Sequence, residues 1–415
     1  MSVELTNQKE TGSYYTPPLL ADFMVYHIFD KRNFILPENV SILEPSAGDG
    51  IFFKSILRNE TFSSRPEFTL PQSVKLLAVE REERELEKVK LFTTPLLPSS
   101  YEARFLNTDY LDFHLANKEK FDLIIGNPPY IKSNYLSEDQ TKSCIEIHKQ
   151  SGLSNKKIKN IWTSFLIGAV QSLTDNGALA FVLPAELLQV IYAKEIRDLL
   201  KENFKDGKID IFSFNELIFK DIEQDVIVLI CAKNQTNPGV SFFHVDKLED
   251  LKKPNYTKDN SNVHRTTLDK WTNYILSDGE LKFLDRIKAK HSLKPIRYYT
   301  DTVAGIVTAA NDYFIADQAT VDEYSLEKFI KPIIKKSSHL PSSLYFTEND
   351  FQLMNKTNVP CLLIDLENKS SVNFPKKHQA YLEVGISRNL HERYKMKLRD
   401  NWYSIPSVWE SEGFF

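Results

Sequence analysis

Short apolar runs alternate with segments of helical periodicity through the first 235 residues, a pattern typical of a parallel sheet covered by helices. We expect strands at residues 40–43, 74–79, 103–106, 121–125, 178–183, 209–214 and 226–231. We expect helices at residues 51–58, 82–91, 162–173 and 193–203. Residues 215–225, between the last two strands, are too few for a crossover helix, so these two strands should pair antiparallel. The pattern therefore predicts an α/β fold with a seven-stranded, Rossmann-like sheet whose last strand is antiparallel.

The pattern changes after residue 231, where the alternation of strands and helices becomes irregular. Residues 234–239 read Asn-Gln-Thr-Asn-Pro-Gly, a turn-rich break, and residues 254–262 form a second polar stretch. We place a domain boundary near residues 235–265. The sequence thus predicts a catalytic domain at residues 1–240 and a smaller, mixed α+β domain at residues 241–415.

Composition limits the class of protein. Hydrophobic residues make up 42% of the chain and charged residues 26%, which is ordinary for a soluble globular protein. The three cysteines are far apart and in no metal-ligand spacing, which argues against a disulfide scaffold or a cysteine zinc site. The polar start is no signal peptide, and no apolar run approaches the roughly 20 residues that cross a bilayer. We therefore expect a soluble, cytoplasmic protein.

A glycine turn follows the first predicted strand, in the segment Leu43-Glu44-Pro-Ser-Ala47-Gly48-Asp-Gly50. Glycine permits backbone angles and a close backbone approach that other residues obstruct, and open α/β sheets bind ligands at this end of a strand. Gly-x-Gly alone is a weak signal, and a plain strand–turn–helix is then the commoner explanation. The missing third glycine of the dinucleotide fingerprint argues against a dehydrogenase.

Two acidic residues follow the next two strands. Glu80 ends the second strand, where a carboxylate can accept hydrogen bonds from both hydroxyls of a ribose. Asp109 lies just past the third, where it can accept from an adenine amino group, with Tyr110 beside it for stacking. Singly, each is more often a surface carboxylate. Together with Glu44, at the ends of three successive strands, they predict a pocket for a ligand that contains adenosine.

The strongest signal is Asn127-Pro128-Pro129-Tyr130, directly after the buried strand at residues 121–125. Two prolines remove two backbone donors and fix the local φ angles, which makes the loop rigid. The Asn127 side-chain oxygen and the Pro128 carbonyl are both acceptors, suited to the two hydrogens of an amino group. Tyr130 offers a flat face for a planar ring.

These motifs resemble, in order and spacing, the gamma-type amino-methyltransferases that modify adenine N6 in the DNA of restriction–modification systems. That family begins with a cofactor motif, matched by Thr11-Gly-Ser-Tyr14-Tyr-Thr16-Pro17. The glycine turn, Glu80, Asp109-Tyr110 and the Asn-Pro-Pro-Tyr loop follow in the family's order. A later aromatic that faces the catalytic loop is matched by Phe219, ahead of the last strand.

The resemblance implies S-adenosylmethionine as cofactor and double-stranded DNA as substrate, in a cytoplasmic, nucleoid-associated enzyme. It implies that an adenine is flipped out of the helix and stacks between Tyr130 and Phe219. No metal is expected, since a sulfonium is already a good leaving group. The implied catalytic residues are Asn127, Pro128, Pro129, Tyr130 and Phe219. The implied cofactor-binding residues are Tyr14, Thr16, Glu44, Ala47, Gly48, Gly50, Glu80, Asp109 and Tyr110.

The second half resembles the target-recognition domains of that family more thinly, at residues 303–314 and 399–403. A basic run at residues 376–399 fits a surface that follows phosphates, although such a run is more often simply solvated. Our candidate DNA contacts are Lys376, Lys377, Arg393, Lys395 and Arg399. Family members usually continue well past the second segment. We expect that the end of this domain is shortened, lies on another polypeptide or is missing from the given sequence.

Several alternatives stay open. Glutamine methyltransferases of release factors also carry Asn-Pro-Pro-Tyr, but they lack the N-terminal motif in this position and a C-terminal domain of this size. Cytosine-N4 methyltransferases usually have serine at the first catalytic position. A chain of this fold could also serve only as the specificity partner of another subunit. Otherwise we expect a monomer, with any restriction endonuclease on a separate protein, because the Glu-x-Lys triplet at residues 367–369 reads as a surface turn.

Overall fold

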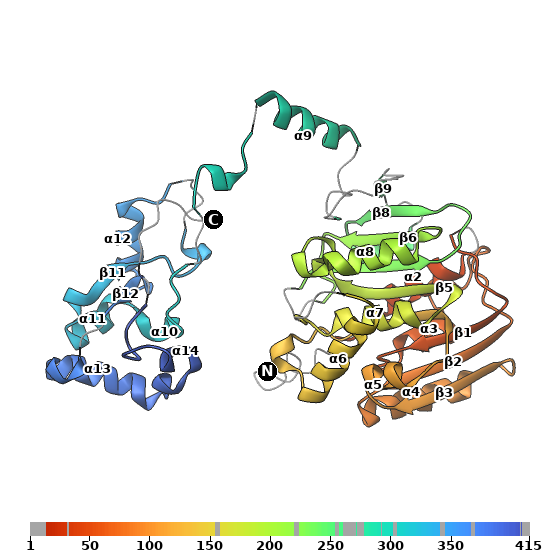
Figure 1. Cartoon of the computed structure of the whole chain (residues 1–415), viewed down its shortest axis with the longest axis horizontal. Coiled ribbons are helices and arrows are strands. Elements are labelled where there is room, and N and C mark those ends of the chain that lie inside the picture. The colour runs from red at the N-terminus through yellow and green to blue at the C-terminus, as the bar shows by residue number, and fades with distance from the viewer. Residues whose placement is uncertain are drawn as a thin grey trace. The chain divides into compact units, whose positions relative to one another are not determined.

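The structure is a computed structural model, which describes residues 14–30, 33–153, 158–219, 224–253, 257–259, 271, 278–291, 293–301, 305–340, 345–366, 370–406 and 408. The chain divides into two compact units, Met1–Leu293 and Lys294–Phe415 (Figure 1). Within the described part of the chain, no helix has the length and apolar character needed to span a membrane.

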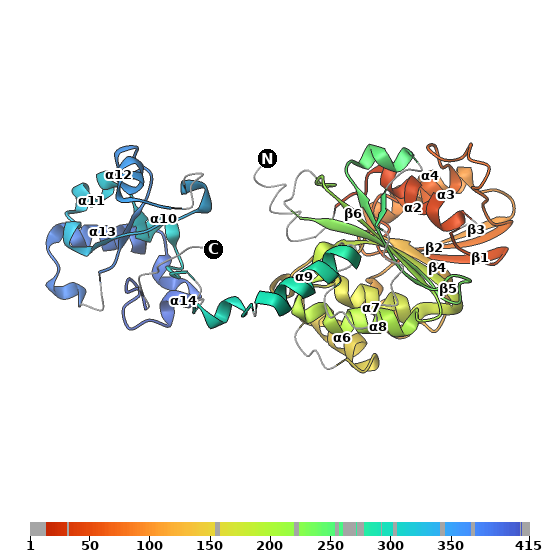
Figure 2. The same cartoon turned by 90° about the horizontal axis from the view of Figure 1, so that it is seen from above.

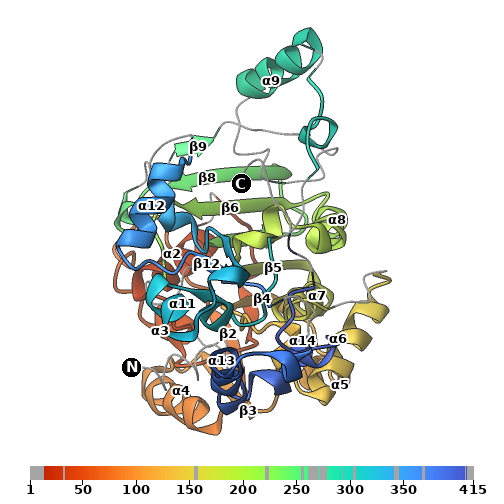
Figure 3. The same ribbon diagram turned by 90° about the vertical axis from the view of Figure 1, so that its left-hand side faces the viewer.

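Within the described residues, the first unit contains one nine-stranded sheet in the order β3-β2-β1-β4-β5-β7-β6-β8-β9. Figure 3 shows β8, β6 and β5 of this sheet side by side. Its strands are β1 (Asn39–Glu44), β2 (Ser73–Glu80), β3 (Tyr101–Asn107), β4 (Phe121–Gly126), β5 (Leu173–Pro184), β6 (Lys208–Phe214), β7 (Val226–Ala232), β8 (Gly239–Val245) and β9 (Thr257–Asp259). The seven predicted strands are confirmed, and β7 pairs antiparallel with both β5 and β6.

The predicted count of seven strands is too low. β8 pairs in parallel with β6, and β9 pairs antiparallel with β8, so the sheet continues past the turn-rich break at residues 234–239. β8 buries Phe242, Phe243 and Val245 and covers what would otherwise be an open edge at β6. The strands β8 and β9 belong to the first unit. Their place in the sheet does not assign catalysis or target recognition to particular residues. The assignment of these roles to residues 1–240 and 241–415 stays a proposal.

Helices cover both faces of the sheet (Figure 2). One face carries α2 (Pro18–Phe29), α3 (Ile51–Leu57) and α4 (Glu83–Leu96). The other carries α5 (Tyr110–Ala116), α6 (Glu138–Gln150), α7 (Trp162–Ser172) and α8 (Lys194–Asn203). The strand β7 is apolar throughout because both faces of the sheet are covered, and all seven of its residues are buried. This is the layered α/β architecture that the sequence predicts.

Buried polar contacts fix α2, the helix that directly follows the N-terminal motif. The His27 Nε2 lies 2.9 Å from Asp210 Oδ2 on β6, and Lys208 pairs with the same carboxylate oxygen at 3.2 Å. The Asp22 carboxylate accepts hydrogen bonds from the Ser55 and Thr61 hydroxyls at 2.7 and 2.8 Å. Buried polar groups that find partners this well restrict how a helix can sit, so the chain before α2 is led to a defined place on the sheet.

The second unit has a three-stranded antiparallel sheet of β10 (Ile315–Ala316), β12 (Leu362–Ile364) and β11 (Ile330–Pro332), in that order. Around it lie α10 (Asn311–Phe314), α11 (Gln318–Tyr324), α12 (Glu348–Lys356), α13 (Lys376–Ser387) and α14 (Tyr394–Lys397). These elements share a separate apolar core. The predicted mixed α+β character of this region is confirmed. The helix α9 (Asp278–His291) precedes it in the chain.

Candidate active site

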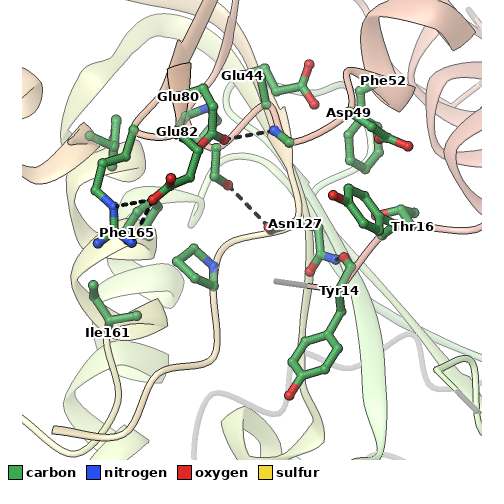
Figure 4. Close-up of a pocket in the computed structure, with 18 of the residues that line it drawn as sticks. Tyr14, Thr16, Glu44, Asp49, Phe52, Glu80, Glu82, Asn127, Ile161 and Phe165 are labelled. Atoms are coloured by element: carbon green, nitrogen blue, oxygen red, sulfur yellow. Dashed lines mark hydrogen bonds and ion pairs between the residues drawn. The ribbon is translucent and has the colours of Figure 1, made fainter. Parts of the chain in front are cut away.

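A pocket opens at the carboxyl ends of the parallel strands β1, β2 and β4, where their last residues meet at one edge of the sheet (Figure 4). Its walls come from the segment before α2, the glycine turn after β1, the end of β2, and α5, α6 and α7. Counted out to its open mouth it holds about 860 Å³ of empty space.

The glycine turn has backbone angles that require glycine. Gly48 has φ of 52° and Gly50 has φ of 75°, both in the left-handed region. A Cβ at Gly50 would also lie 2.8 Å from two ring carbons of Phe92 and 2.9 Å from Val89. The turn therefore depends on glycine for conformation at both positions and for space at the second.

Glu80 connects this turn to the end of β2. Its Oε2 accepts a hydrogen bond from the Gly48 backbone N–H at 2.9 Å, and its Oε1 accepts from the Glu82 backbone N–H at 2.9 Å. Each carboxylate oxygen can accept a second hydrogen bond. The side chain is thus anchored by the backbone on both sides and still has capacity to bind hydroxyl groups of a ligand.

Glu44 is the most deeply buried acid of the pocket, with 1% of its surface exposed. Its Oε2 finds no hydrogen-bond partner within the part of the chain described. Burial raises the pKa of Glu44 well above its usual value, and the nearby Asp49 and Glu80 raise it further, against a small opposing effect of the Phe53 backbone N–H. Burial also raises the pKa of Asp49. Three carboxyl groups so placed favour a ligand with positive charge.

Asp109 caps α5 and is held by a residue that the sequence analysis did not single out. Its Oδ1 accepts from the Leu111 backbone N–H at 2.9 Å, and its Oδ2 accepts from Gln140 Nε2 at 2.9 Å. Gln140 also forms a capping box with Ser137 at the start of α6. The Ser-x-x-Gln spacing is visible in the sequence as a helix start, but its second role beside Asp109 is visible only in the structure.

Tyr110 is almost fully buried, with 2% of its surface exposed, and its ring packs 4.9 Å from that of Phe165 on α7. Stacking of Tyr110 against a cofactor stays a prediction. Phe52, Ile161 and Phe165 add an apolar wall to the pocket. These three were not predicted, because Phe52 and Phe165 read in the sequence as ordinary core positions of helices and Ile161 as an apolar residue beside one.

Asn127 lies between the acidic part of the pocket and a group of aromatic rings. Its Nδ2 donates to the Tyr14 carbonyl oxygen at 2.8 Å, and its Oδ1 accepts from the Tyr130 hydroxyl at 2.9 Å. Its own carbonyl oxygen accepts from the Ser46 hydroxyl at 3.2 Å, which ties the loop to the glycine turn. Burial, and secondarily Tyr14, raise the pKa of Tyr130 well above its usual value, so its hydroxyl stays protonated as a donor.

We call the group of rings the aromatic cluster; it consists of Tyr14, Tyr130 and Phe219. The Tyr14 ring centroid lies 6.0 Å from that of Tyr130 and 5.8 Å from that of Phe219. The structure therefore brings together the N-terminal motif, the catalytic loop and the segment after β6, which are far apart in the sequence. Thr16 is buried and lines the pocket next to this cluster. Residues 11–13 of the N-terminal motif lie outside the described residues.

The predicted DNA contacts belong to the second unit, at α13, α14 and the residues beside them. Four of them are exposed: Lys376, Lys377, Arg393 and Lys395. Lys377 donates to the Ser325 hydroxyl at 3.1 Å, and Arg393 donates to the Ala309 carbonyl at 2.9 Å. Exposed basic side chains are available to phosphates, and their role in binding DNA stays a prediction.

Arg399 differs from the other four, because its guanidinium is used inside the unit. Its Nη1 donates to the Trp402 and Ser404 carbonyls at 3.3 and 2.8 Å. Its Nη2 donates to the Val307 and Thr308 carbonyls at 3.4 and 2.9 Å. Arg399 thus joins the two segments that resemble a target-recognition domain, and a phosphate contact by this residue stays a prediction. All three residues of the Glu-x-Lys triplet, 367–369, fall outside the described residues.

Two family models match the chain. The Eco57I restriction-modification methylase model matches residues 59–219, and the model of the C-terminal domain of the type II methyltransferase M.Eco57I matches residues 268–415. The chain belongs to this family of restriction–modification methyltransferases.

Curated relatives support the same family. The chain is 25% identical over 418 residues to the type II methyltransferase M.AccI of Acinetobacter calcoaceticus, which covers 98% of this chain and 71% of that protein. It is 22% identical over 452 residues to the type II methyltransferase M.BanIII of Aneurinibacillus aneurinilyticus, with coverage of 97% and 74%.

Two solved structures share the fold. The type IIG restriction endonuclease BpuSI matches 99% of this methyltransferase and 49% of its own chain, with 15% identity and a TM-score of 0.50. The DrdV–DNA complex matches 78% of this chain and 38% of its own, with 16% identity and a TM-score of 0.51.

Proposed function

We propose that this methyltransferase transfers a methyl group from S-adenosylmethionine to the exocyclic N6 of an adenine that is flipped out of double-stranded DNA. The observation that carries the proposal is the position of Asn127. Its amide lies where a pocket lined with carboxylates meets the aromatic cluster, next to Tyr14 and Tyr130. A group transfer needs two ligands that meet at one point, and Asn127 is at such a point.

The acidic pocket suits the cofactor. Bound there, S-adenosylmethionine would supply a methyl group on a positively charged sulfur. Glu80 would accept hydrogen bonds from the ribose hydroxyls, and Asp109 from the adenine amino group. The buried Glu44 carboxyl, whose Oε2 has no partner within the described residues, fits a ligand that brings positive charge or hydrogen-bond donors to it. Phe52, Ile161 and Phe165 would exclude water from the adenine ring.

The loop at Asn127 suits an amino group. An aromatic amine is a poor nucleophile because its lone pair is delocalised into the ring. Hydrogen bonds from its two N–H groups to Asn127 Oδ1 and to the Pro128 carbonyl would favour a pyramidal nitrogen. The lone pair would then be free to take the methyl group that bound S-adenosylmethionine supplies, leaving S-adenosylhomocysteine, and the nitrogen would lose a proton to solvent. Fixed acceptors and correct placement do this work without a strong base.

Double-stranded DNA as the substrate is supported by the family and by the fold shared with the DrdV–DNA complex. Adenine N6 is stacked inside a duplex, so the base must leave the helix to reach Asn127. The exposed lysines and arginine of α13 and its neighbourhood would contact phosphates. A separate restriction endonuclease or specificity subunit would then act with this chain.

The test is single-molecule sequencing of DNA from cells that express the wild-type chain or the Asn127→Ala variant, in a host without adenine methylation. We expect N6-methyladenine at one sequence motif with the wild type and none with Asn127→Ala. The purified variant should still bind S-adenosylhomocysteine, since the acidic pocket is intact. The matched control is Asn203→Ala on α8, whose amide also donates to a backbone carbonyl but lies on another helix.

Other outcomes would replace the proposal. N4-methylcytosine in the sequenced DNA would assign the chain to cytosine, and methyl transfer to protein alone would assign it to a glutamine side chain. Near-normal turnover by Asn127→Ala would remove the catalytic role from that residue. Methylation that appears only when neighbouring genes are co-expressed would identify a partner chain, and size-exclusion chromatography with DNA would detect the complex.

A further inference from the structure

Tyr14 has an unexpected place among the three rings of the aromatic cluster. Its ring contacts both of the others, at 6.0 Å from Tyr130 and 5.8 Å from Phe219, with interplanar angles of 36° and 38°. In the proposed function Tyr130 and Phe219 are the two rings between which the flipped adenine stacks. The ring that contacts both of them therefore belongs to the N-terminal segment.

Tyr14 helps to line the acidic pocket, but its ring points away from the acids (Figure 4). Figure 4 shows it on the side of Asn127 away from Glu44 and Glu80, pointing away from both acids. Its backbone carbonyl accepts the hydrogen bond from Asn127 Nδ2, and this leaves Oδ1 turned toward the Tyr130 hydroxyl. The backbone of Tyr14 thus binds the same Asn127 amide that would accept hydrogen bonds from the amino group, while the Tyr14 ring lies on the substrate side.

We infer that the Tyr14 ring fills, in the free enzyme, the space that the flipped base takes, and that it must move out when the base arrives. This inference rests on the proposed function. An empty slot between apolar rings would forfeit van der Waals contacts on both walls, and a phenol restores them. A purine is flat as well, so it can take over contacts with Tyr130 and Phe219 as the phenol leaves.

Tyr14 consequently competes with the base. Removal of its ring lowers the cost of inserting a base and tightens binding of a duplex whose adenine is flipped. A larger ring at this position has the opposite effect. If Tyr14 were instead a third wall that stacks on the bound base, both signs would be reversed, because removal would weaken binding and a larger ring would strengthen it.

The test compares two duplexes that carry the site found by sequencing, one with the target adenine and one with an abasic position in its place. The abasic duplex needs no base to enter the slot, so it reports all other contacts. Dissociation constants are measured for both duplexes by fluorescence anisotropy in the presence of S-adenosylhomocysteine. The measured quantity is the affinity for the adenine duplex divided by the affinity for the abasic duplex.

We expect this ratio to rise about 3- to 10-fold in Tyr14→Ala and to fall by a similar factor in Tyr14→Trp, as stacking contributions of one ring suggest. Tyr14→Phe keeps the ring and the carbonyl, so it should match the wild type. The matched control is Tyr101→Ala on β3, which removes a phenol that donates to the Pro71 carbonyl at 2.9 Å, and it should leave the ratio unchanged.

The outcomes are distinguishable. An unchanged or lower ratio in Tyr14→Ala, or an unchanged or higher ratio in Tyr14→Trp, overturns the inference even if the wild type methylates the duplex. Should Tyr14→Ala fail to fold, Tyr14→Trp decides alone. If the wild type transfers no methyl group to the adenine duplex, the proposed function fails, and this inference fails with it.

Discussion

The two sides of the candidate site are built in different ways. On the acidic side, Glu80 is held by two backbone N–H groups and Asp109 by one, while Glu44 keeps an unpartnered oxygen within the described structure. On the aromatic side, Tyr14, Asn127 and Tyr130 use one another as partners. The acidic side is thus prepared for a ligand, whereas the aromatic side is closed on itself.

This difference fits an enzyme that binds a small cofactor in a preformed pocket and a large substrate by rearrangement. Side chains anchored by backbone groups cost little to keep in place when the ligand binds. Side chains that satisfy one another must give up contacts before a base can replace them. We therefore expect changes on the acidic side to alter cofactor affinity, and changes on the aromatic side to alter handling of the base.

The largest effect should follow from Glu80→Ala. The change removes the acceptor of the Gly48 and Glu82 backbone N–H groups and the proposed acceptor of two ribose hydroxyls. Loss of two or more hydrogen bonds to a charged group costs about 3 kcal/mol, or roughly 100-fold in affinity for S-adenosylhomocysteine. Isothermal titration calorimetry measures this affinity, and anisotropy with non-specific duplex DNA should show no comparable loss.

Glu87→Ala is the matched control for that variant. Glu87 lies on α4, where its exposed side chain pairs with Lys90 at 3.6 Å, and exposed pairs contribute little to stability. Its removal should leave cofactor affinity unchanged. Wild-type affinity in Glu80→Ala, or an equal loss of cofactor and DNA affinity, would contradict the division of the site into two sides.

The second effect concerns pH and Glu44. Burial, followed by Asp49 and Glu80, raises the pKa of Glu44, so the free enzyme keeps a proton there at pH values where an ordinary glutamate is ionised. A cationic ligand favours the carboxylate and displaces that proton. Affinity for S-adenosylmethionine should therefore rise with pH, by at most about tenfold per unit for one proton, until pH passes the raised pKa.

The same proton affects folding with the opposite sign. Because the folded-state pKa of Glu44 is the higher one, its contribution to stability is present at low pH and is lost as pH rises toward that pKa. Glu44→Gln should flatten both the affinity profile and this part of the stability profile. A pH slope of affinity that persists in Glu44→Gln would assign the proton to another group, such as Asp49.

Sequence reasoning succeeded where local patterns determine structure. The seven predicted strands are apolar runs between turn signals, and parallel pairing brings their carboxyl ends to one edge, so Glu44 and Glu80 could be expected near each other. It missed β8 because the turn-rich residues before it looked like the end of a sheet. Whether a break ends a sheet depends on an open edge at β6, which no local pattern reports.

Side-chain choices between distant segments could not be predicted either. Gln140 reads as a helix cap, and only folding shows that its amide reaches Asp109. Tyr110 reads as a ring at a pocket edge, but packing of α5 on α7 buries it against Phe165. The place of Tyr14 between two other rings depends on three segments that no spacing in the sequence connects.

The smallest effect should follow from Tyr130→Phe, a substitution on the aromatic side of the site. The ring stays for stacking, and only the hydroxyl that donates to Asn127 Oδ1 at 2.9 Å is lost. Without that donor, the side-chain amide keeps its hydrogen bond to the Tyr14 carbonyl, and Ser46 holds the backbone carbonyl of Asn127. A single hydrogen bond contributes about 1 kcal/mol, so the rate of methyl transfer should fall roughly fivefold, with unchanged affinity for S-adenosylhomocysteine. Radiolabelled methyl transfer in single turnovers measures the rate.

The control is Tyr26→Phe on α2, which loses a hydroxyl that donates to Glu67 at 2.7 Å and should keep the wild-type rate. Asn127 Oδ1 has two lone pairs, so it can accept from the arriving amino group and from the Tyr130 hydroxyl together. A rate in Tyr130→Phe equal to that of wild type would contradict a positioning role of this hydroxyl in the chemical step.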